Sequence, residues 1–149
     1  MSYKKYYYSI IKEIKKRIIY FYQDNLISLV IFGSVAKDTF SPESDIDILI
    51  ILNKRKGSYI DFSEYYDNIE TNLNTLKKAK KKKLNIIINP IFKEKDKLTI
   101  NTPYLWKNKF IVLYDRGNFF KNFTENLRNY EKRLVTQDNK IPYIEVRNG

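Results

Sequence analysis

Two short apolar segments joined by a polar connection constrain the fold of this chain more than any other feature. Leu26–Phe32 reads LISLVIF and Ile48–Leu52 reads ILIIL. Runs of this length, rich in large and β-branched residues and bounded by turn-forming residues, are typical of buried strands. The loop of residues 37–44 contains Pro42, which stiffens a turn without needing a backbone donor. The pattern therefore predicts two neighbouring strands of one sheet.

Two aspartates stand where the second apolar segment begins. Asp45 and Asp47 flank Ile46, and side chains two apart on a strand project from the same face, about 6–7 Å apart along the chain. Carboxylate oxygens are preferred ligands of Mg²⁺, which is commonly held by one or two of them together with substrate phosphates. Asp45 and Asp47 are therefore the candidate metal ligands, while Ile46 and Ile48 are expected to face the core.

A Gly-Ser pair ends the first apolar segment. Gly33 permits close approach of the backbone to a ligand, and a short helix opening at Ser34 would offer N–H groups to a phosphate. Taken alone, such a pair is usually only a turn, and two aspartates around an isoleucine usually begin a solvated strand. Their occurrence together, in this order, favours a site where phosphate and metal meet.

With this spacing, Phe32–Ile51 resembles the nucleotidyltransferase superfamily that includes DNA polymerase β, and in particular its minimal single-domain members. The family motif G-S-x10-D-x-D is matched by Gly33, Ser34, Asp45 and Asp47. The serine common before the first aspartate is also present, as Ser44. The resemblance is specific over this segment and only architectural elsewhere.

The resemblance implies an α/β (α+β) fold, namely a polymerase β-like mixed β-sheet flanked by helices. It also implies Mg²⁺-dependent transfer of a nucleoside monophosphate from ATP, or another nucleoside triphosphate, with release of pyrophosphate. Asp45 and Asp47 would be catalytic and hold the metal, and Gly33, Ser34 and Ser44 would bind the nucleotide. Minimal members often act as antitoxins that modify a tyrosine of a HEPN-type RNase toxin, so a HEPN-family protein is the implied partner.

One position departs from the family pattern. Many members carry a third carboxylate on a following strand, where it helps to activate the attacking hydroxyl. The strand expected here is Lys83–Asn89, and Asn85 is the expected equivalent. Asparagine coordinates a metal through its carbonyl but takes no proton at neutral pH. Asp38, which replaces a glycine common in the loop, is a candidate to compensate.

Composition excludes several other chemistries. The chain contains no histidine and no cysteine, which rules out histidine-dependent triads, thiol catalysis, thiolate zinc sites and disulfides. Its 149 residues fit one minimal nucleotidyltransferase domain, residues 1–149. No apolar run approaches the roughly 20 residues of a membrane span, and the tyrosine-rich start does not resemble a secretory signal. We therefore expect a cytoplasmic protein without a membrane partner.

Periodicity predicts the element order α-β-β-α-β-β-α. Apolar residues at helical spacing predict a first helix over residues 3–24, a second long helix after Gly57, and a third from Asn118. The apolar positions that indicate the second helix are Phe62, Tyr65, Tyr66, Ile69, Leu73 and Leu76. The remaining expected segments are a strand at Phe110–Tyr114 and a linker at residues 135–142.

The net charge of +11 raises a nucleic-acid hypothesis, because lysines attract phosphates regardless of sequence. The densest lysine cluster lies in residues 77–83. No RNA-binding aromatic motif accompanies it, and lysines solvating a helix end in a lysine-rich chain produce the same pattern. Nucleic acid is therefore not the favoured partner.

Three functions stay open at this point. The leading one is an enzyme that transfers AMP from ATP to a hydroxyl of a protein partner. The first alternative is a catalytically weak or inactive nucleotide-binding regulatory module, which Asn85 favours. The second is an RNA-directed nucleotidyltransferase, which would bind RNA with a steep salt dependence.

Overall fold

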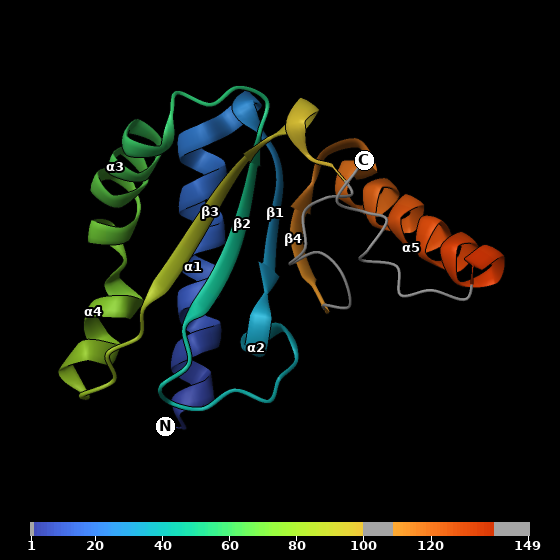
Figure 1. Ribbon diagram of the computed structural model, residues 1–149. Helices are drawn as coiled ribbons and strands as arrows, with labels where there is room; N and C mark the ends of the chain where they lie inside the picture. Colours follow the sequence, from blue (N-terminus) through green and yellow to red (C-terminus); the bar gives the residue numbers. More distant parts are fainter. Residues whose placement is uncertain (1, 100–108, 139–149) are drawn as a thin grey trace.

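A four-stranded mixed sheet with helices on both faces forms the body of the protein (Figure 1). The computed structural model describes residues 2–99 and 109–138. The strands are β1 (Leu26–Phe32), β2 (Ile46–Leu52), β3 (Ile88–Glu94) and β4 (Ile111–Asp115). The helices are α1 (Tyr3–Tyr22), α2 (Gly33–Ala36), α3 (Ser58–Asn68), α4 (Asn74–Lys81) and α5 (Phe119–Asp138). In the order β3-β2-β1-β4, β1 pairs antiparallel with β2 and β4, and β2 pairs parallel with β3. The expected α/β fold with a mixed sheet is confirmed.

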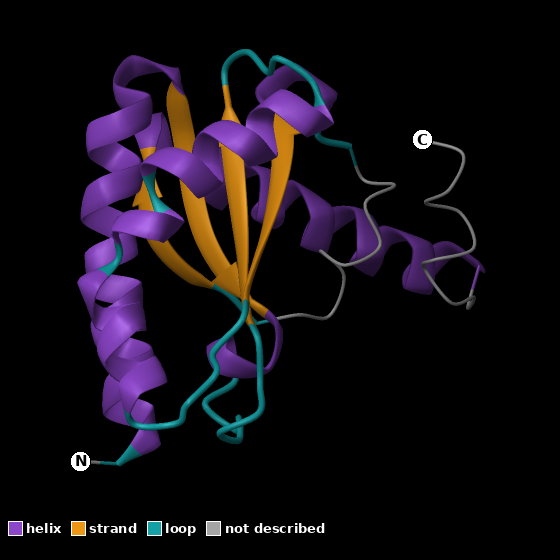
Figure 2. Cartoon of the chain, turned by 90° about the vertical axis from the view of Figure 1, so that its left-hand side faces the viewer, coloured by secondary structure: helices purple, strands orange, loops and turns teal. Residues whose placement is uncertain are grey.

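The apolar side chains of β2 alternate between two hydrophobic clusters. Ile46, Ile48 and Ile50 pack on the side of the sheet covered by α1, α3 and α4. Leu49 and Ile51 face the opposite side, where residues of α5 join them. Strands covered on both faces become continuous apolar runs, which is why β1 and β2 were recognisable in the sequence. Figure 2 shows the sheet between these helices, with the loops that follow β1 gathered below it.

The long helix expected after Gly57 is broken into two. α3 ends at Asn68, Leu73 adopts an extended conformation with ψ 103°, and α4 begins at Asn74. Glu13 of α1 explains the new start, because its carboxylate accepts hydrogen bonds from the backbone N–H groups of Asn74 and Thr75 at 3.2 and 2.9 Å. A side-chain carboxylate that satisfies the free N–H groups of a helix start stabilises that start.

The break also changes which residues of this region are buried. Of the apolar positions expected on the second helix, Phe62 and Tyr66 are 48% and 44% exposed and lie outside the core. Three other positions of the same predicted set, Tyr65, Ile69 and Leu73, are buried in the core, together with Ala79.

β3 begins at Ile88, five residues later than expected. Lys83 takes a left-handed conformation with φ 64°, and Leu84 N–H donates to the Ala79 carbonyl at 2.9 Å, so the chain is still leaving α4 at this point. Further along, β4 starts one residue later than predicted and α5 continues to Asp138, so residues 135–138 are helical rather than linker. Residues 139–142 of the predicted linker lie outside the described residues.

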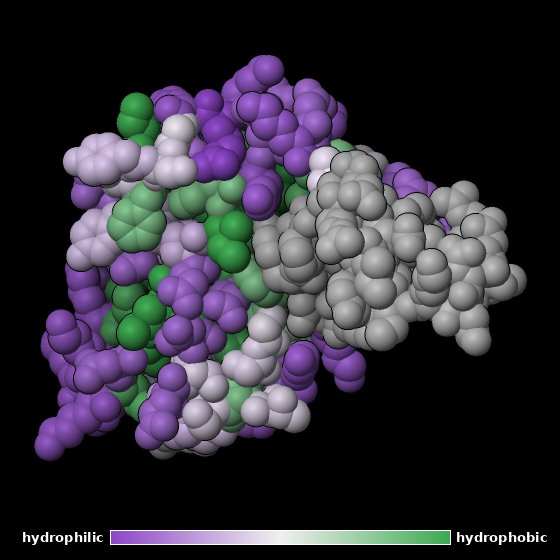
Figure 3. Space-filling view, viewed as in Figure 1, coloured by the Kyte–Doolittle hydropathy of each residue, from purple (hydrophilic) through white to green (hydrophobic). Residues whose placement is uncertain are grey.

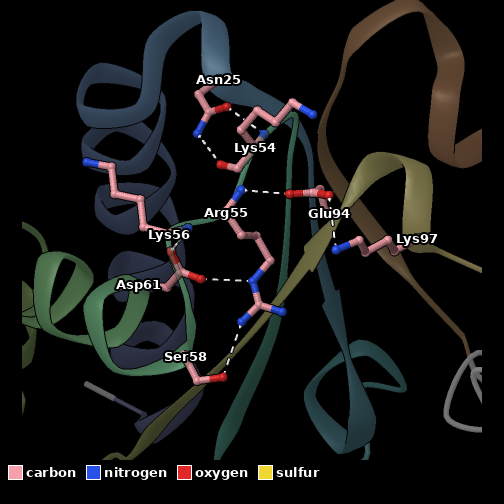
Figure 4. A network of polar contacts seen from close by, with 8 residues as sticks. All are labelled: Asn25, Lys54, Arg55, Lys56, Ser58, Asp61, Glu94 and Lys97. Atoms are coloured by element: carbon pink, nitrogen blue, oxygen red, sulfur yellow. Dashed lines mark hydrogen bonds and ion pairs between the residues drawn. The ribbon is translucent and has the colours of Figure 1, made fainter.

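A polar network closes the end of the sheet where β2 finishes (Figure 4). The almost fully buried Asp61 accepts hydrogen bonds from the Arg55 Nε at 2.8 Å and from the Lys56 N–H at 3.0 Å. Glu94 accepts the N–H of Arg55 at 3.0 Å, and this bond is the main cause that lowers the pKa of Glu94. The network ties α3 to β2 and β3. It lies at the opposite end of β2 from the paired aspartates.

Within the described ranges, no helix has the length and apolar character needed to cross a membrane.

Candidate active site

The end of β1 and the start of β2 bring the predicted motif together. In the antiparallel register Phe32 lies opposite Asp47, so the Gly-Ser pair that follows Phe32 is next to the aspartates although the sequence separates them. In Figure 1, α2 lies at this end of β1, beside the start of β2. The strand pairing alone therefore juxtaposes the two halves of the motif.

The two aspartates face one point. The Asn89 side chain donates from Nδ2 to Oδ2 of Asp45 at 3.0 Å and to Oδ1 of Asp47 at 3.2 Å. Because one nitrogen atom contacts both carboxylates, the carboxylates converge on a space that a small cation could share. Asp45 and Asp47 are half-exposed and Asn89 is exposed, so this space is open to solvent.

The third position of the site is occupied by Asn89 rather than by Asn85. In the parallel register of β2 and β3, Asn89 pairs with Asp47. Asn85 precedes the strand and lines a separate hollow of about 330 Å³ with Tyr66 and Lys77. Asn85 and Asn89 flank the three isoleucines 86–88. Because β3 begins only at Ile88, Asn89 lies in the strand beside Asp47 and Asn85 lies before it. The side chain beside the aspartates is still an amide, so the expected lack of a third carboxylate holds for this position.

Gly33 is required by the geometry of the site. Its φ of +74° lies in the left-handed region, and a Cβ at this position would stand 2.2 Å from Oδ2 of Asp47. Only a residue without a side chain allows the backbone and the carboxylate to approach so closely. Ser34 follows at the half-exposed start of α2. Its contact with a phosphate stays a prediction.

Ser44 shapes the loop that precedes the aspartates. Its Oγ accepts the Ser41 N–H at 2.9 Å, while its own N–H donates to the Ser41 carbonyl at 3.0 Å. These two bonds close a turn just before Asp45. Its predicted contact with the nucleotide would be additional to this structural role.

Asp38 faces α1 rather than the paired aspartates. Its carboxylate accepts a hydrogen bond from the Tyr8 hydroxyl and lies 3.6 Å from the Lys4 ammonium group. The bond from Tyr8 is the main cause that lowers the pKa of Asp38. Asp38 has a φ of 58°, in the left-handed region that favours glycine. Its contacts give no support to Asp38 as a third acid of the site.

The donor set fits a hard divalent cation. No cluster of three or more Asp, Glu, His or Cys side chains occurs in residues 2–99 and 109–138. The candidate metal ligands at this site are therefore the carboxylates of Asp45 and Asp47 and the amide of Asn89. An oxygen set of this kind suits Mg²⁺, with phosphate oxygens and waters completing the coordination. Asn89 would have to turn its Oδ1 toward the cation, because the NH₂ group that now faces the carboxylates is only a donor.

The metal-free site carries an electrostatic cost. Burial raises the pKa of Asp47 above its ordinary value, and the neighbouring charge of Asp45 adds to the shift, while the hydrogen bond from Asn89 opposes it. Two carboxylates that converge without a cation repel one another, so ionised Asp47 destabilises the folded state. This cost is fully present above the raised pKa of the folded state, and it is lost as the pH falls below the ordinary pKa of an unfolded aspartate, where Asp47 is protonated in both states.

Asp47→Asn should therefore stabilise the metal-free protein. At pH 7 in EDTA we expect its Tm to exceed that of the wild type by about 1–2 °C, a small gain because solvent screens a half-exposed carboxylate. The gain should shrink when the same thermal unfolding is measured at pH 4. A variant that is less stable than the wild type at pH 7 would contradict this account of Asp47.

Two solved structures similar to this chain are toxin–antitoxin complexes. One is described as a toxin–antitoxin with AMP-PNP, with a TM-score of 0.47 and 15% identity over 84% of this chain and 92% of that chain. Another is a tri-AMPylated Shewanella oneidensis HEPN toxin in complex with an MNT antitoxin, with a TM-score of 0.42 and 11% identity over 86% of this chain and 92% of that chain.

The sequence relatives come from Methanocaldococcus jannaschii. This chain is 30% identical over 115 residues to a protein named "Putative protein adenylyltransferase MJ1305", covering 74% of each chain. It is 32% identical over 101 residues to MJ0141, which carries the same designation, covering 64% of this chain and 85% of that relative. The family model for the nucleotidyltransferase domain matches residues 10–116, a range that contains the whole motif and Asn89. The chain therefore belongs to the nucleotidyltransferase domain family.

Proposed function

We propose that this protein is a Mg²⁺-dependent adenylyltransferase that moves AMP from ATP to a hydroxyl group of a protein. The observation that carries the proposal is the convergence of Asp45 and Asp47 on one point beside Gly33. The designation of both archaeal relatives as protein adenylyltransferases supports the choice of AMP and of a protein acceptor.

The reaction joins the acceptor oxygen to the α-phosphorus of ATP. The bond between that phosphorus and the oxygen leading to the β-phosphate breaks, pyrophosphate leaves, and the hydroxyl proton passes to solvent or to a base of the acceptor. Bound Mg²⁺ would neutralise charge on the phosphates during this exchange. Asp45 and Asp47 would hold the cation, and Gly33 lets the turn after β1 lie against Asp47. Since Asn89 takes no proton, catalysis depends on alignment and electrostatics.

An exposed aromatic surface that runs along α3 and reaches the site at Ile87 favours a protein acceptor. Tyr59, Phe62, Tyr66 and Ile87 are 84%, 48%, 44% and 58% exposed, respectively. Ile87 adjoins the site, because its carbonyl accepts the Ile46 N–H at 2.8 Å. Figure 3 shows apolar and aromatic residues gathered over α3 and the start of β3. Aromatic and apolar residues grouped in this way are characteristic of surfaces that bind proteins.

We further propose that the acceptor is a tyrosine of a HEPN-family protein, so that the chain acts as an antitoxin. This part of the proposal comes from the resemblance of the motif to the minimal members of the family. The exposed side chain of Ile87 is compatible with it, because Ile87 adjoins the aspartate site and is 58% exposed.

Labelled ATP tests the proposal. Incubation of the purified protein with Mg²⁺, ATP labelled at the α-phosphate, and a HEPN protein encoded beside it should label the HEPN protein and release pyrophosphate. The label should resist ribonuclease and be removed by protease. Label that enters added RNA instead would favour the RNA-directed alternative, and no label in either would refute AMP transfer.

The amide at Asn89 favours one competing function, a regulatory module that binds nucleotide without turnover. Calorimetry with ATP and Mg²⁺ distinguishes the two functions when it is run beside the pyrophosphate assay. Binding without pyrophosphate release on any partner supports the regulatory module, whereas release that requires the partner supports the transferase.

A further inference from the structure

The face of α1 that carries Tyr3 and Tyr7 holds the loop between the two halves of the motif. The Tyr3 hydroxyl donates to the Phe40 carbonyl at 2.6 Å. The Tyr7 hydroxyl lies 2.5 Å from the Ser44 carbonyl and 3.3 Å from the Ser41 carbonyl. In Figure 1 the loop between α2 and β2 passes the N-terminal end of α1. A loop without regular hydrogen bonding is thereby fixed to a helix at several points.

Phe40 anchors the middle of the same loop. It is 4% exposed, and its ring lies among those of Tyr3, Tyr7 and Tyr8 at centroid distances of 5.7, 4.7 and 6.0 Å. The Lys4 ammonium group stands 5.3 Å from the Phe40 ring centroid. Packing therefore fixes the centre of the loop, and the tyrosine hydroxyls fix its backbone.

The two aspartates differ in what holds them. Asp47 lies inside β2, where it is paired with Phe32 on one side and Asn89 on the other. Asp45 precedes β2, which begins at Ile46, so its position depends on the loop. The Ser44 carbonyl belongs to the peptide group that joins Ser44 to Asp45. A hydrogen bond to this carbonyl sets the direction in which the Asp45 side chain leaves the backbone.

We infer that Tyr7 is a positioning residue that aims Asp45 at the point shared with Asp47. A hydroxyl has one proton, so the shorter bond, to Ser44, is the principal one. Tyr7 is fully buried, and water cannot readily replace its hydroxyl there. The inference rests on the proposed function only in taking Asp45 as a metal ligand.

Tyr7→Phe isolates this role, because it keeps the ring against Phe40 and removes only the hydroxyl. With a non-hydrolysable ATP analogue present, we expect its affinity for Mn²⁺, followed by electron paramagnetic resonance, to fall about tenfold. The kcat of AMP transfer should fall by a similar factor, while the KM for ATP stays within about twofold because the contacts to the nucleotide are kept.

Tyr65→Phe is the matched control. Tyr65 is also fully buried, and its hydroxyl donates to Oε1 of Glu70 at 3.0 Å, away from the motif. It should lose stability as Tyr7→Phe does but keep the Mn²⁺ affinity of the wild type. Tyr3→Phe should have an intermediate effect, because its partner Phe40 is five residues before Asp45.

The outcomes separate this inference from the proposed function. Weaker Mn²⁺ binding in Tyr7→Phe alone supports the positioning role even if no AMP transfer is found in any variant. Equal Mn²⁺ affinity in the wild type and a folded Tyr7→Phe, or equal losses in Tyr7→Phe and Tyr65→Phe, overturns it. Absence of Mn²⁺ binding in the wild type overturns it as well.

Discussion

Asp45→Asn should lower the rate of AMP transfer to the protein acceptor by on the order of a thousandfold, equivalent to about 4 kcal/mol of transition-state stabilisation. The reason is that the described site has only two carboxylates, Asp45 and Asp47, and an amide in place of a third. Among residues 2–99 and 109–138 no third acid joins the pair, and the carboxylate of Asp38 is engaged by Tyr8 and Lys4. The measurement is the initial rate of labelling of the acceptor at saturating ATP.

Asp96→Asn provides the matched control for this variant. Asp96 is exposed in the turn after β3, at the end of the sheet opposite to the paired aspartates, and the replacement makes the same change in charge and shape. It should label the acceptor within about twofold of the wild-type rate, as expected of a surface substitution away from the site. A rate for Asp45→Asn that equals that of Asp96→Asn would show that the site has been assigned to the wrong residues.

Gly33→Ala should be nearly as damaging, but for a steric reason. The added Cβ would lie 2.2 Å from Oδ2 of Asp47, so either the carboxylate or the turn must move. A displacement of about 1 Å in a site of this kind costs about a hundredfold in rate. We expect at least that loss in labelling, together with weakened Mn²⁺ binding because Asp47 is the residue displaced.

Gly117→Ala separates the steric effect from backbone strain. Gly117 also has a positive φ, +58°, but a Cβ there would meet nothing within 4 Å. An alanine in the left-handed region costs about 1–2 kcal/mol at either position. Both variants should therefore lose stability, and only Gly33→Ala should lose transfer. Comparable activity in the two variants would contradict the close contact between Gly33 and Asp47.

The parts of the fold that local pattern determines could be predicted from the sequence. β1 and β2 are continuous apolar runs because both faces of the sheet are covered. The motif halves come together because the same two strands pair with Phe32 opposite Asp47. The local spacing of residues was therefore sufficient to predict the fold class and the pairing of Asp45 with Asp47.

The parts that depend on contacts between distant segments could not be predicted in the same way. The long helix breaks because Glu13 of α1, 61 residues before Asn74 in the sequence, caps a new helix start at Asn74. The start of β3 follows from where α4 ends, and this start decides that Asn89 rather than Asn85 meets the aspartates. The spacing of Tyr3 and Tyr7 indicates one face of a helix, but nothing local shows that the hydroxyls of this face hold a loop far along the chain.

The central claim is that Asp45 and Asp47 share one divalent cation with the phosphates of a bound nucleotide. Its most direct test is a crystal structure of the protein with Mn²⁺ and a non-hydrolysable ATP analogue, with diffraction recorded at the manganese absorption edge. The account predicts an anomalous peak in contact with carboxylate oxygens of both aspartates, with the Asn89 NH₂ group turned away from them. A peak elsewhere, or bound nucleotide whose metal touches neither Asp45 nor Asp47, would contradict it.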